Sequence, residues 1–296
     1  MIKLIARALR LPFLSASVLP FIFGTLIDKS GFNLAGFILG LVAVSATHLS
    51  ANLINDWADS KSGVDALDPR FFAFFGGSKL IQEKALSERF YFNLGALFAG
   101  LALICVIGLA FILKSVFVVL IYLLIILLSW QYSARPLRFS YRLSGEIFIF
   151  LLFGPALVMG GYFIQTGIFS DFKILILSLP FGFFTTAILF ANEIPDYFED
   201  KAAGKFTWVN ILGQKHSYIL YYLLMLAGFF SISMAVYLKY LGSVSAISLF
   251  LVFLAGKAAN ILRLNYADKT KLVQSSKITI AIQALVSIIL IADAII

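Results

Sequence analysis

Residues 32–65 read FNLAGFILGLVAVSATHLSANLINDWADSKSGVD, a long apolar run that ends in a cluster of amide and carboxylate side chains. The apolar part, Phe32–Asn55, is long enough for a membrane helix, because a crossing needs about 20 mostly apolar residues. The polar side chains begin before this run has ended, and carboxylates at membrane depth are costly unless a cation neutralises them. The stretch therefore predicts a transmembrane helix with a functional site at one end.

The composition of the whole chain also indicates a membrane protein. Of its 296 residues, 61% are hydrophobic and 13% are charged, with a mean hydropathy of +0.98, whereas soluble domains carry about 25% charged residues. This balance excludes a soluble, disordered or nucleic-acid-binding class, so no nucleic acid is expected as a partner. A single cysteine, Cys105, excludes a disulfide framework, and no Cys/His cluster offers a zinc site. Nothing in the sequence indicates an obligate protein partner.

Eight further apolar stretches accompany the first. Together they predict an all-α, polytopic membrane bundle of nine transmembrane helices, which forms a single domain over residues 1–296. We do not expect the N-terminal stretch to be a signal peptide, because Pro20 interrupts it and eight more spans follow. We expect the nine spans at Leu11–Leu26, Phe32–Asn55, Phe90–Leu113, Val116–Tyr132, Gly145–Ile164, Phe172–Ala191, Tyr218–Leu238, Ser243–Ile261 and Ile278–Ile296.

Charged residues divide unevenly between the two sides that these spans define. Of the 23 Lys and Arg residues, all lie on the side of the N-terminus except Lys29, Lys114, Lys173 and Lys239. The positive-inside rule therefore places the N-terminus in the cytoplasm and the C-terminus outside, as an odd number of spans requires. Of the 15 acidic residues, all lie on that same side except Asp28, Asp171 and Asp293. We expect a multi-pass protein of a prokaryotic plasma membrane, with its active site facing the cytoplasm.

Acidic clusters end the second and the sixth predicted span. In the first cluster, intervals of four, three and four residues place one polar stripe on a helix: His48, Asn52, Asn55 and Asp59. In the second cluster, intervals of four form another stripe: Asn192, Asp196 and Asp200. The clusters align as a repeat, in which Asn55, Asp59 and Gly63 match Asp196, Asp200 and Gly204. Pro195 lies inside the second stripe and should kink or open its helix.

Two matching carboxylate clusters indicate a site for hard cations. They offer oxygen ligands without His or Cys, and Mg²⁺ typically binds through one or two carboxylates together with substrate phosphates. A diphosphate held by two ions would leave oxygens for the Arg and Lys side chains on the same side. The alternative is that the acids are solvated helix ends, which explains one isolated cluster better than two matching ones.

The two motifs resemble those of the UbiA superfamily of intramembrane aromatic prenyltransferases. The motifs are Asn55-x3-Asp59-x3-Gly63-x-Asp65 and Asn192-x3-Asp196-x3-Asp200-x3-Gly204-Lys205. Three shorter segments add to the resemblance: Arg10-Leu11-Pro12, Gly76-Gly77-Ser78-Lys79 and Tyr132-Ser133-Ala134-Arg135-Pro136-Leu137-Arg138. The resemblance implies nine transmembrane helices, with the acidic motifs on the second and the sixth.

The spacing within the first motif is similar to one branch of this superfamily. The gap from Asp59 to Asp65 resembles the branch that prenylates 1,4-dihydroxy-2-naphthoate in menaquinone biosynthesis. The branch that uses 4-hydroxybenzoate usually has a third aspartate where this chain has Gly63. Gly204-Lys205 also resembles the naphthoate branch. Two positions depart from that branch: Phe206 stands where Arg or Asn is more common, and Lys79 stands where Arg is often found.

The resemblance also implies roles for individual residues. The metal ligands would be Asn55, Asp59, Asp196 and Asp200, which would hold two Mg²⁺ ions together with the diphosphate. The substrate-binding residues would be Arg10, Asn52, Asp65, Lys79, Ser133, Arg135, Arg138, Asn192 and Lys205. Tyr132 would join Asp59, Asp196 and Asp200 as a catalytic residue, close to the allylic cation. The substrates would be a polyprenyl diphosphate, with its tail among the apolar spans, and an aromatic small molecule.

Three alternatives stay open at the level of the sequence. The same chemistry could act on another acceptor: 4-hydroxybenzoate, homogentisate or a lipid glycerol. A phosphatidyltransferase also uses Mg²⁺ and aspartates, but it keeps its aspartates in one contiguous block. A cation transporter also carries carboxylates within its spans, but it would need acids deep in the membrane with exits to both sides.

Overall fold

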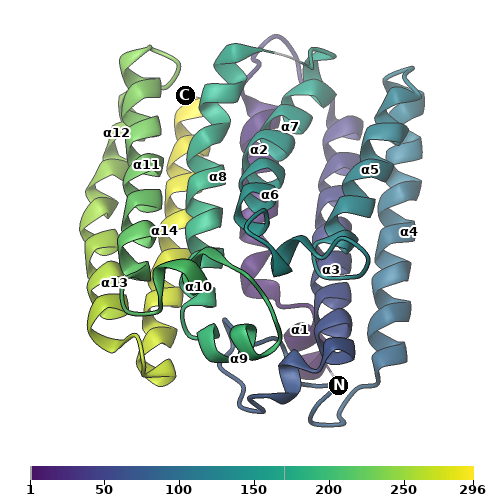
Figure 1. The fold of residues 1–296 in the computed structure, drawn as a ribbon. Coiled ribbons are helices and arrows are strands. Elements are labelled where there is room, and N and C mark those ends of the chain that lie inside the picture. The colour runs from purple at the N-terminus through teal and green to yellow at the C-terminus, as the bar shows by residue number, and fades with distance from the viewer. Residues whose placement is uncertain (1, 170) are drawn as a thin grey trace.

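The computed structural model describes residues 2–169 and 171–296, which form helices and no strand. The longest helices run side by side through the molecule (Figure 1). In chain order the α-helices are α1 (Ile2–Ala8), α2 (Ser15–Leu26), α3 (Leu34–Ser62), α4 (Glu88–Ile112), α5 (Phe117–Gln131), α6 (Gly145–Leu151), α7 (Leu157–Thr166), α8 (Phe172–Glu193), α9 (Tyr197–Ala202), α10 (Trp208–Leu212), α11 (Ser217–Tyr237), α12 (Ser243–Ala246), α13 (Val252–Asn265) and α14 (Lys269–Ile295).

All nine predicted spans are largely helical, but the structure does not establish each of them as a membrane crossing. Among the described residues, seven helical segments are long and apolar enough to cross a membrane. The pair α1 and α2, bent by 49° where the two helices meet, gives an eighth. The remaining helix, α5, has 15 residues, which at about 1.5 Å per residue cover less than the roughly 30 Å of a bilayer core. The all-helical membrane fold is confirmed, and the number of nine spans stays a prediction.

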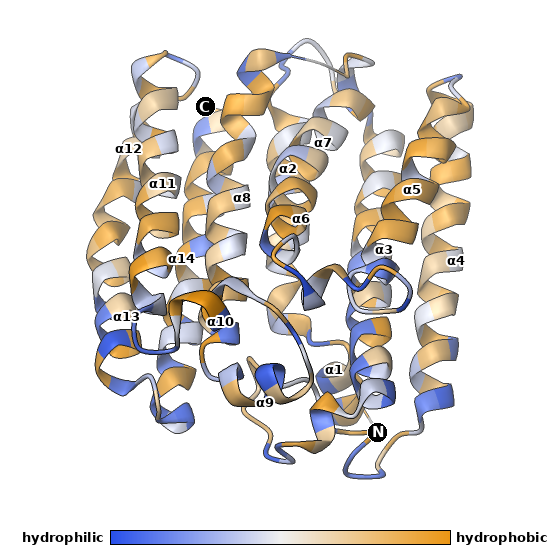
Figure 2. Cartoon of the chain, viewed as in Figure 1, coloured by the Kyte–Doolittle hydropathy of each residue, from blue (hydrophilic) through white to orange (hydrophobic). Residues whose placement is uncertain are grey.

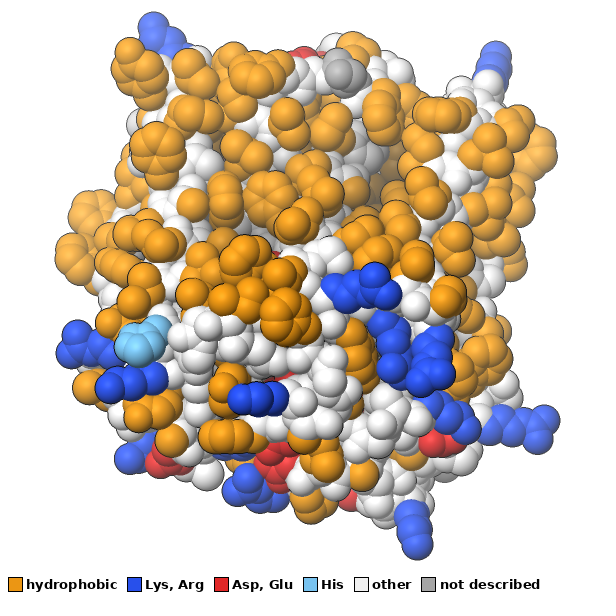
Figure 3. All heavy atoms as spheres, in the orientation of Figure 1, with side chains coloured by type: hydrophobic (Ala, Val, Ile, Leu, Met, Phe, Trp, Pro, Cys, Tyr) orange, Lys and Arg blue, Asp and Glu red, His pale blue; other side chains and the backbone are white. Residues whose placement is uncertain are grey.

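The two ends of the bundle differ in chemistry. The N- and C-termini lie at opposite ends of the molecule (Figure 1), as the predicted topology requires. Hydrophilic residues collect at the end that carries the N-terminus, whereas the middle of the bundle is hydrophobic (Figure 2). On the face seen in Figure 3, hydrophobic side chains cover the upper part and most Lys and Arg side chains lie over the lower part. Exposed apolar side chains such as Leu120 and Phe253 suit contact with lipid tails.

Prolines accompany breaks in two of the central helices. Between α6 and α7 the chain forms a π-helical segment, η4 (Leu152–Ala156), which contains Pro155. Helix α8 ends at Glu193 and α9 begins at Tyr197, so the helix opens around Pro195 as the sequence predicts. Asp196 therefore lies in the turn between two helices rather than on one continuous helix, but Asn192, Asp196 and Asp200 still line one cavity.

Helices α2 and α7 cross at a point where neither has room for a side chain. A methyl group at Gly161 would lie 2.5 Å from the carbonyl oxygen of Phe21, and one at Gly24 would lie 2.2 Å from that of Val158. Small residues permit this close approach of backbones between membrane helices. The two glycines therefore hold α7 against the N-terminal part of the bundle.

We expect Gly161→Ala to lower the free energy of unfolding by about 1–3 kcal/mol, because the added methyl group forces α2 and α7 apart. Thermal unfolding in detergent micelles measures the change. Gly160→Ala is the matched control, since a methyl group at Gly160 meets no neighbouring atom within 4 Å, and it should unfold like the wild type. Equal unfolding temperatures for the two variants would contradict tight packing at this crossing.

Candidate active site

A cavity of about 610 Å³ begins at the two acidic motifs and extends into the apolar middle of the bundle. Its charged end is lined by acids of both motifs and by basic residues, which include Asn55, Asp59, Asp196, Asp200, Lys79, Lys205 and Lys269. Its apolar end is lined from α2, α3, α5 and α7 by side chains that include Phe21, Val44, Ile121, Tyr122, Leu157 and Phe163. The cavity thus has the polarity of an amphiphile with a charged head and a hydrocarbon tail.

Asn55 of the first motif is held by three polar neighbours. Helix α3 carries Asn55 and Asp59 one turn apart, close to its end at Ser62. The side-chain amide of Asn55 donates to Ser133 Oγ (2.5 Å) and to Asp59 Oδ2 (3.4 Å). Its Oδ1 accepts from Arg10 Nη1 (2.9 Å). Ser133 and Arg10, both predicted to bind substrate, therefore act in this structure by orienting Asn55.

Asp59 lies between the two motifs. Its carboxylate accepts from the Tyr141 hydroxyl (3.4 Å) and lies 3.9 Å from Lys205 Nζ, which in turn lies 3.0 Å from Asp200 Oδ1. Burial alone would lower the pKa of Lys205, but the carboxylates of Asp200 and Asp59 outweigh it and raise that pKa well above its usual value. Lys205 is therefore charged and joins the first motif to the second.

The second motif contacts the glycine-rich loop that precedes α4. Gly76 donates its backbone N–H to Asp196 Oδ2 (2.9 Å). The φ angles of Gly76 (72°) and Gly77 (75°) are positive, which glycine adopts without steric cost. Burial, with the nearby carboxylate of Asp200, raises the pKa of Asp196 to about 7, and burial likewise raises the pKa of Asp200. A bound cation would relieve the repulsion between these buried acids.

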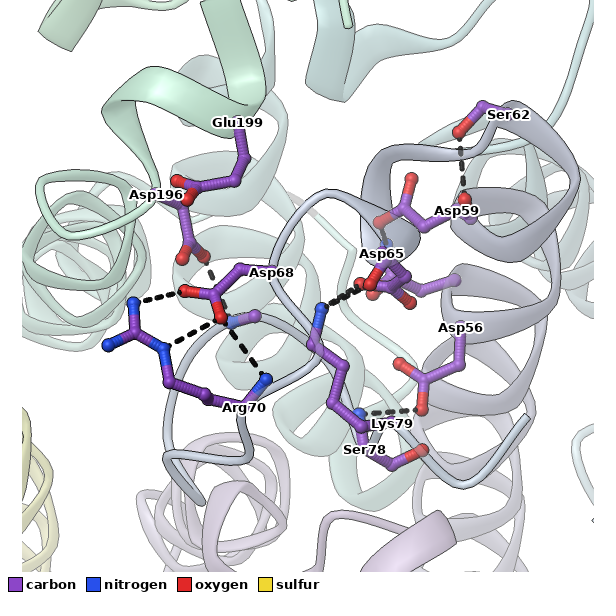
Figure 4. A network of polar contacts seen from close by, with 12 residues as sticks. Asp56, Asp59, Ser62, Asp65, Asp68, Arg70, Ser78, Lys79, Asp196 and Glu199 are labelled. Carbon is purple, nitrogen blue, oxygen red and sulfur yellow. Dashed lines mark hydrogen bonds and ion pairs between the residues drawn. The ribbon is translucent and has the colours of Figure 1, made fainter. Parts of the chain in front are cut away.

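Asp65 is in the short helix η2 (Val64–Ala66) and pairs with Lys79. Lys79 Nζ donates to Asp65 Oδ1 (3.0 Å) and to the Asp65 backbone carbonyl (2.9 Å) (Figure 4). Burial, together with the carboxylates of Asp59 and Asp56, raises the pKa of Asp65 to about 7 against the opposing effect of Lys79. A methyl group at Gly77 would lie 2.9 Å from Asp65 Oδ2, so the loop reaches this carboxylate because residue 77 is glycine.

Asp56 binds the Gly76–Lys79 loop on the side that faces away from the cavity. It is 2% exposed and is not one of the residues that line the cavity. The Ser78 backbone N–H donates to Asp56 Oδ2 (3.1 Å) (Figure 4), and Arg10 Nη1 lies 3.5 Å from Asp56 Oδ1. The Ser78 hydroxyl is hydrogen-bonded to the Tyr91 hydroxyl (2.6 Å). Asp56 therefore positions the Gly76–Lys79 loop.

Four residues outside the predicted set complete the charged end: Asp68, Arg70, Glu199 and Lys269. Lys269 Nζ lies 2.9 Å from Asp68 Oδ2 and 2.9 Å from Glu199 Oε1. Arg70 donates to the Asp68 carboxylate through Nε (2.9 Å) and Nη2 (2.8 Å) (Figure 4). These hydrogen bonds hold the pKa of Asp68 far below its usual range. No spacing in the sequence links the four, and the only signal for them is that acids and bases crowd one side of the membrane.

Three further predicted residues line the wall of the cavity: Asn52, Tyr132 and Asn192. The Asn52 amide donates to the carbonyl of Leu9 (3.1 Å), and Asn192 Oδ1 accepts from the Ser276 hydroxyl (2.8 Å). Both side chains are therefore fixed by neighbouring segments while they face the cavity.

Two predicted diphosphate ligands, Arg135 and Arg138, are not among the residues that line the cavity. Arg135 is exposed. The guanidinium of Arg138 lies over the ring of Tyr141, 4.4 Å from its centroid. The structure connects Arg138 to the site only through Tyr141 and Asp59, and direct binding of a ligand by either arginine stays a prediction.

The donor atoms of the two motifs fit a hard divalent cation in combination with an anionic ligand. Within residues 2–169 and 171–296, no three His, Cys, Asp or Glu side chains are grouped closely enough to hold a metal by themselves. Each motif instead offers a pair of oxygen donors, Asn55 with Asp59 and Asp196 with Asp200. Mg²⁺ commonly takes one or two carboxylates and completes its shell with phosphate oxygens and water. Each pair alone supplies too few oxygen ligands for a divalent cation, and the oxygens of a diphosphate bound between the pairs would supply the others.

Comparison with known protein sequences finds a family and relatives that are named as prenyltransferases. Residues 17–281 match the UbiA prenyltransferase family. UbiA prenyltransferase domain-containing protein 1 of Xenopus tropicalis is 31% identical over 223 residues, which are 74% of this chain and 62% of that protein. The 1,4-dihydroxy-2-naphthoate octaprenyltransferase of Mycobacterium leprae (strain TN) is 29% identical over 191 residues, which are 64% of this chain and 62% of that enzyme. The matched region is thus less than two thirds of either relative.

Solved structures share the fold at low sequence identity. The apo structure of a UbiA homologue from Aeropyrum pernix K1 has a TM-score of 0.73 and 18% identity, and the match covers 94% of this chain and 97% of that one. A UbiA homologue from Archaeoglobus fulgidus bound to GPP and Mg²⁺ has a TM-score of 0.64 and 16% identity, with 98% and 99% covered. The likeness extends over nearly the whole bundle.

Proposed function

The chain belongs to the UbiA prenyltransferase family, and we propose that it transfers a polyprenyl group from an allylic diphosphate to an aromatic acceptor. The observation that carries the proposal is the single cavity, which joins two paired acidic motifs to an apolar space of the bundle. A polyprenyl diphosphate is divided in the same way, into a charged head and a hydrocarbon tail. With its head at the motifs and its tail along the apolar wall, the donor would have the bond to be broken near the boundary between them.

The two motifs would hold the head of the donor. Asn55 and Asp59 would bind one Mg²⁺ ion, and Asp196 and Asp200 the other, each together with the diphosphate. When bound, the ions would neutralise the negative charge that develops on the leaving diphosphate. The homologue from Archaeoglobus fulgidus, which has GPP and Mg²⁺ bound, supports a prenyl diphosphate and Mg²⁺ as ligands of this fold.

Hydrogen bonds and ion pairs within the protein fix the side chains at the charged end of the cavity before a ligand binds. Ser133 and Arg10 fix the orientation of Asn55 from two sides, and Gly76 holds the carboxylate of Asp196. Lys205 is a charged donor between the motifs. Groups that are fixed before the ligand arrives need no costly reorientation as charge develops.

Tyr132 is suited to act at the boundary between head and tail. It lines the cavity and directly precedes Ser133, whose hydroxyl is bonded to Asn55. The electron-rich face of a tyrosine ring attracts a cation. As the carbon–oxygen bond of the donor breaks, with its electron pair leaving on the diphosphate, Tyr132 would stabilise the allylic cation until the acceptor attacks.

We propose 1,4-dihydroxy-2-naphthoate, the acceptor in menaquinone biosynthesis, as the aromatic substrate. A ring carbon would form the new bond to the prenyl group, and the ring would then lose carbon dioxide from the attacked position. The spacing from Asp59 through Gly63 to Asp65 supports this acceptor. The name of the Mycobacterium leprae relative does so as well. Other acceptors, 4-hydroxybenzoate, homogentisate or a lipid glycerol, would use the same donor site.

The charged end of the cavity should face the cytoplasm in a multi-pass membrane protein. The acidic motifs lie at the hydrophilic end of the bundle, which also carries the N-terminus (Figure 2). Excess Lys and Arg mark the cytoplasmic side of membrane proteins. A donor and an acceptor that are made in the cytoplasm would then meet the protein at this end.

One assay tests the function and the acceptor together. Purified protein in liposomes is supplied with Mg²⁺, a polyprenyl diphosphate and each of the four acceptors in turn. We expect 1,4-dihydroxy-2-naphthoate to be preferred by about 100-fold or more in kcat/KM, since a polar acceptor site rejects molecules that leave its groups unpaired. EDTA should stop the reaction. Product with a different acceptor alone would overturn the naphthoate assignment, and no product with any acceptor would overturn the function.

A further inference from the structure

Lys269 lies between the two halves of the charged site. It is the first residue of α14, and it lines the cavity. Its Nζ is 2.9 Å from Asp68 Oδ2, 2.9 Å from Glu199 Oε1 and 3.9 Å from Asp196 Oδ1. Asp68 follows the first acidic motif along the chain, whereas Asp196 and Glu199 belong to the second. One ammonium group therefore joins an acid that follows the first motif to two acids of the second.

Lys205 makes an equivalent bridge through other acids. Its Nζ lies 3.0 Å from Asp200 Oδ1 and 3.9 Å from Asp59 Oδ2. The side chains of Lys205 and Lys269 are 12% and 14% exposed, so both bridges are shielded from water. Asp59, Asp196 and Asp200, three of the four proposed metal ligands, thus each have a lysine as a neighbouring cation.

Electrostatics favours an ammonium group beside these three metal ligands only while no divalent ion is bound to them. The two shorter contacts of Lys269, with Asp68 and Glu199, involve acids that are not proposed metal ligands. Buried carboxylates without a cation are strongly unfavourable. Once a divalent ion occupies the same carboxylates, it repels a nearby ammonium group. A diphosphate offers new anionic oxygens, and the flexible four-carbon stem of lysine can carry its charge to them.

We propose that Lys269 is a diphosphate-binding residue, and that Lys269 and Lys205 supply the positive charge beside the metal ligands when no divalent ion is bound. When ions and donor bind, Lys269 Nζ turns from Asp196 to an oxygen of the diphosphate. The inference rests on the proposed function, because that function makes Asp59, Asp196 and Asp200 the metal ligands. It adds to the donor site a residue from the start of the last helix.

Lys269→Gln tests the two states of the lysine separately. In EDTA, its unfolding temperature should fall by about 3 °C or more, because Asp196 and Glu199 lose their cation. With Mg²⁺ alone, the concentration that gives half of the thermal stabilisation should fall about fivefold, because no ammonium group competes for the carboxylates. At saturating Mg²⁺, inorganic diphosphate should bind about tenfold more weakly, because it loses one charged donor.

Lys271→Gln is the matched control. It removes the same charge from the same turn of α14, but Lys271 is exposed and pairs with Asp268 (3.5 Å), so all three measurements should equal those of the wild type. A wild-type Mg²⁺ midpoint in Lys269→Gln, or wild-type affinity for inorganic diphosphate, overturns the proposal. These measurements involve no prenyl transfer, so a wild-type protein that binds Mg²⁺ and diphosphate without forming product would overturn the proposed function alone.

Amine labelling of the wild-type protein gives a second test that does not depend on the folding of a variant. Read by mass spectrometry, labelling of Lys269 should increase when Mg²⁺ alone is added and should fall when inorganic diphosphate is added with it. Labelling of Lys271 should stay constant. Constant labelling of Lys269 under all three conditions overturns the proposal.

Discussion

Replacing Asp59 or Asp196 by asparagine is expected to lower the kcat/KM of prenyl transfer by a factor of about 1,000 or more. Each substitution keeps the size of the side chain but removes one of the few negative charges that can hold an ion. The structure holds both carboxylates in place before a ligand arrives: Asp59 accepts from Asn55 and Tyr141, and Asp196 accepts from Gly76. The measurement uses purified variants at saturating Mg²⁺ with the donor and acceptor that the wild type accepts.

Asp28→Asn is the control for this pair. Asp28 lies in the connection between α2 and α3, away from the residues that line the cavity, so the same change of charge there should leave activity intact. A folded Asp59→Asn or Asp196→Asn variant with wild-type kcat/KM would remove the affected motif from metal binding. Loss of activity in only one of the two would leave a site with a single ion.

The helical fold can be predicted from the sequence because length and hydropathy suffice to identify a membrane helix. The ends of the helices at the acidic motifs are also predictable, because Gly63 (φ 82°) and Gly204 (φ 75°) mark them as C-terminal glycines do. Helix α5 shows where prediction from length and hydropathy fails. Whether its 15 residues cross a bilayer depends on tilt, local thinning and neighbouring helices, and none of these is written in the segment itself.

The acids of the site can be predicted where they recur at helical intervals, and not where the chain folds back. Asn55 and Asp59 share one face of α3, and a repeat of the pattern points to Asp196 and Asp200. Asp68 and Lys269 are 201 residues apart in sequence, and only tertiary packing brings them within 2.9 Å. Residues that belong to turns and helix starts have no periodicity, so their part in a site becomes visible only in three dimensions.

Basic residues present a different difficulty. Arg135, Arg138 and Lys205 all lie on the Lys- and Arg-rich side of the predicted topology, where positive charge serves orientation as well as binding. The structure separates them: Lys205 contacts both motifs, whereas Arg135 is exposed and Arg138 lies over Tyr141. Charge, side of the membrane and resemblance to family motifs favour all three in the sequence, and none of these criteria shows which side chain reaches the cavity.

The break at Pro195 shows how a local departure from helix shapes the site. A continuous helix would keep Asp196 on the same face as Asn192. The chain turns between Glu193 and Tyr197, and Asp196 in this turn accepts from the backbone N–H of Gly76 and lies 3.9 Å from Lys269. Asn192 and Asp196 nevertheless line the same cavity, so the break at Pro195 leaves both on the side of the site.

Gly160→Phe is expected to shorten the prenyl donors that the protein accepts. Gly160 is on α7 and lines the cavity, and a Cβ atom added there would meet no neighbouring atom within 4 Å. A phenyl ring would therefore fill space proposed for the tail. The kcat/KM for an octaprenyl donor should fall by about 100-fold, while that for geranyl diphosphate should stay within about threefold, because only the longer chain reaches α7. Competition between the two donors, read by mass spectrometry of the products, gives the ratio directly.

Gly100→Phe is the matched control for the tail. Gly100 is an exposed residue of α4 at which an added Cβ atom would also meet no atom within 4 Å, but it is not one of the cavity-lining residues. The same ring at this position would point into lipid and should leave the donor ratio unchanged, which separates blockage of the cavity from a general effect of bulk on a membrane helix. If Gly160→Phe lowered the kcat/KM for both donors equally, the tail would not lie along α7. The apolar part of the cavity would then have to serve the acceptor, or the path by which a donor enters.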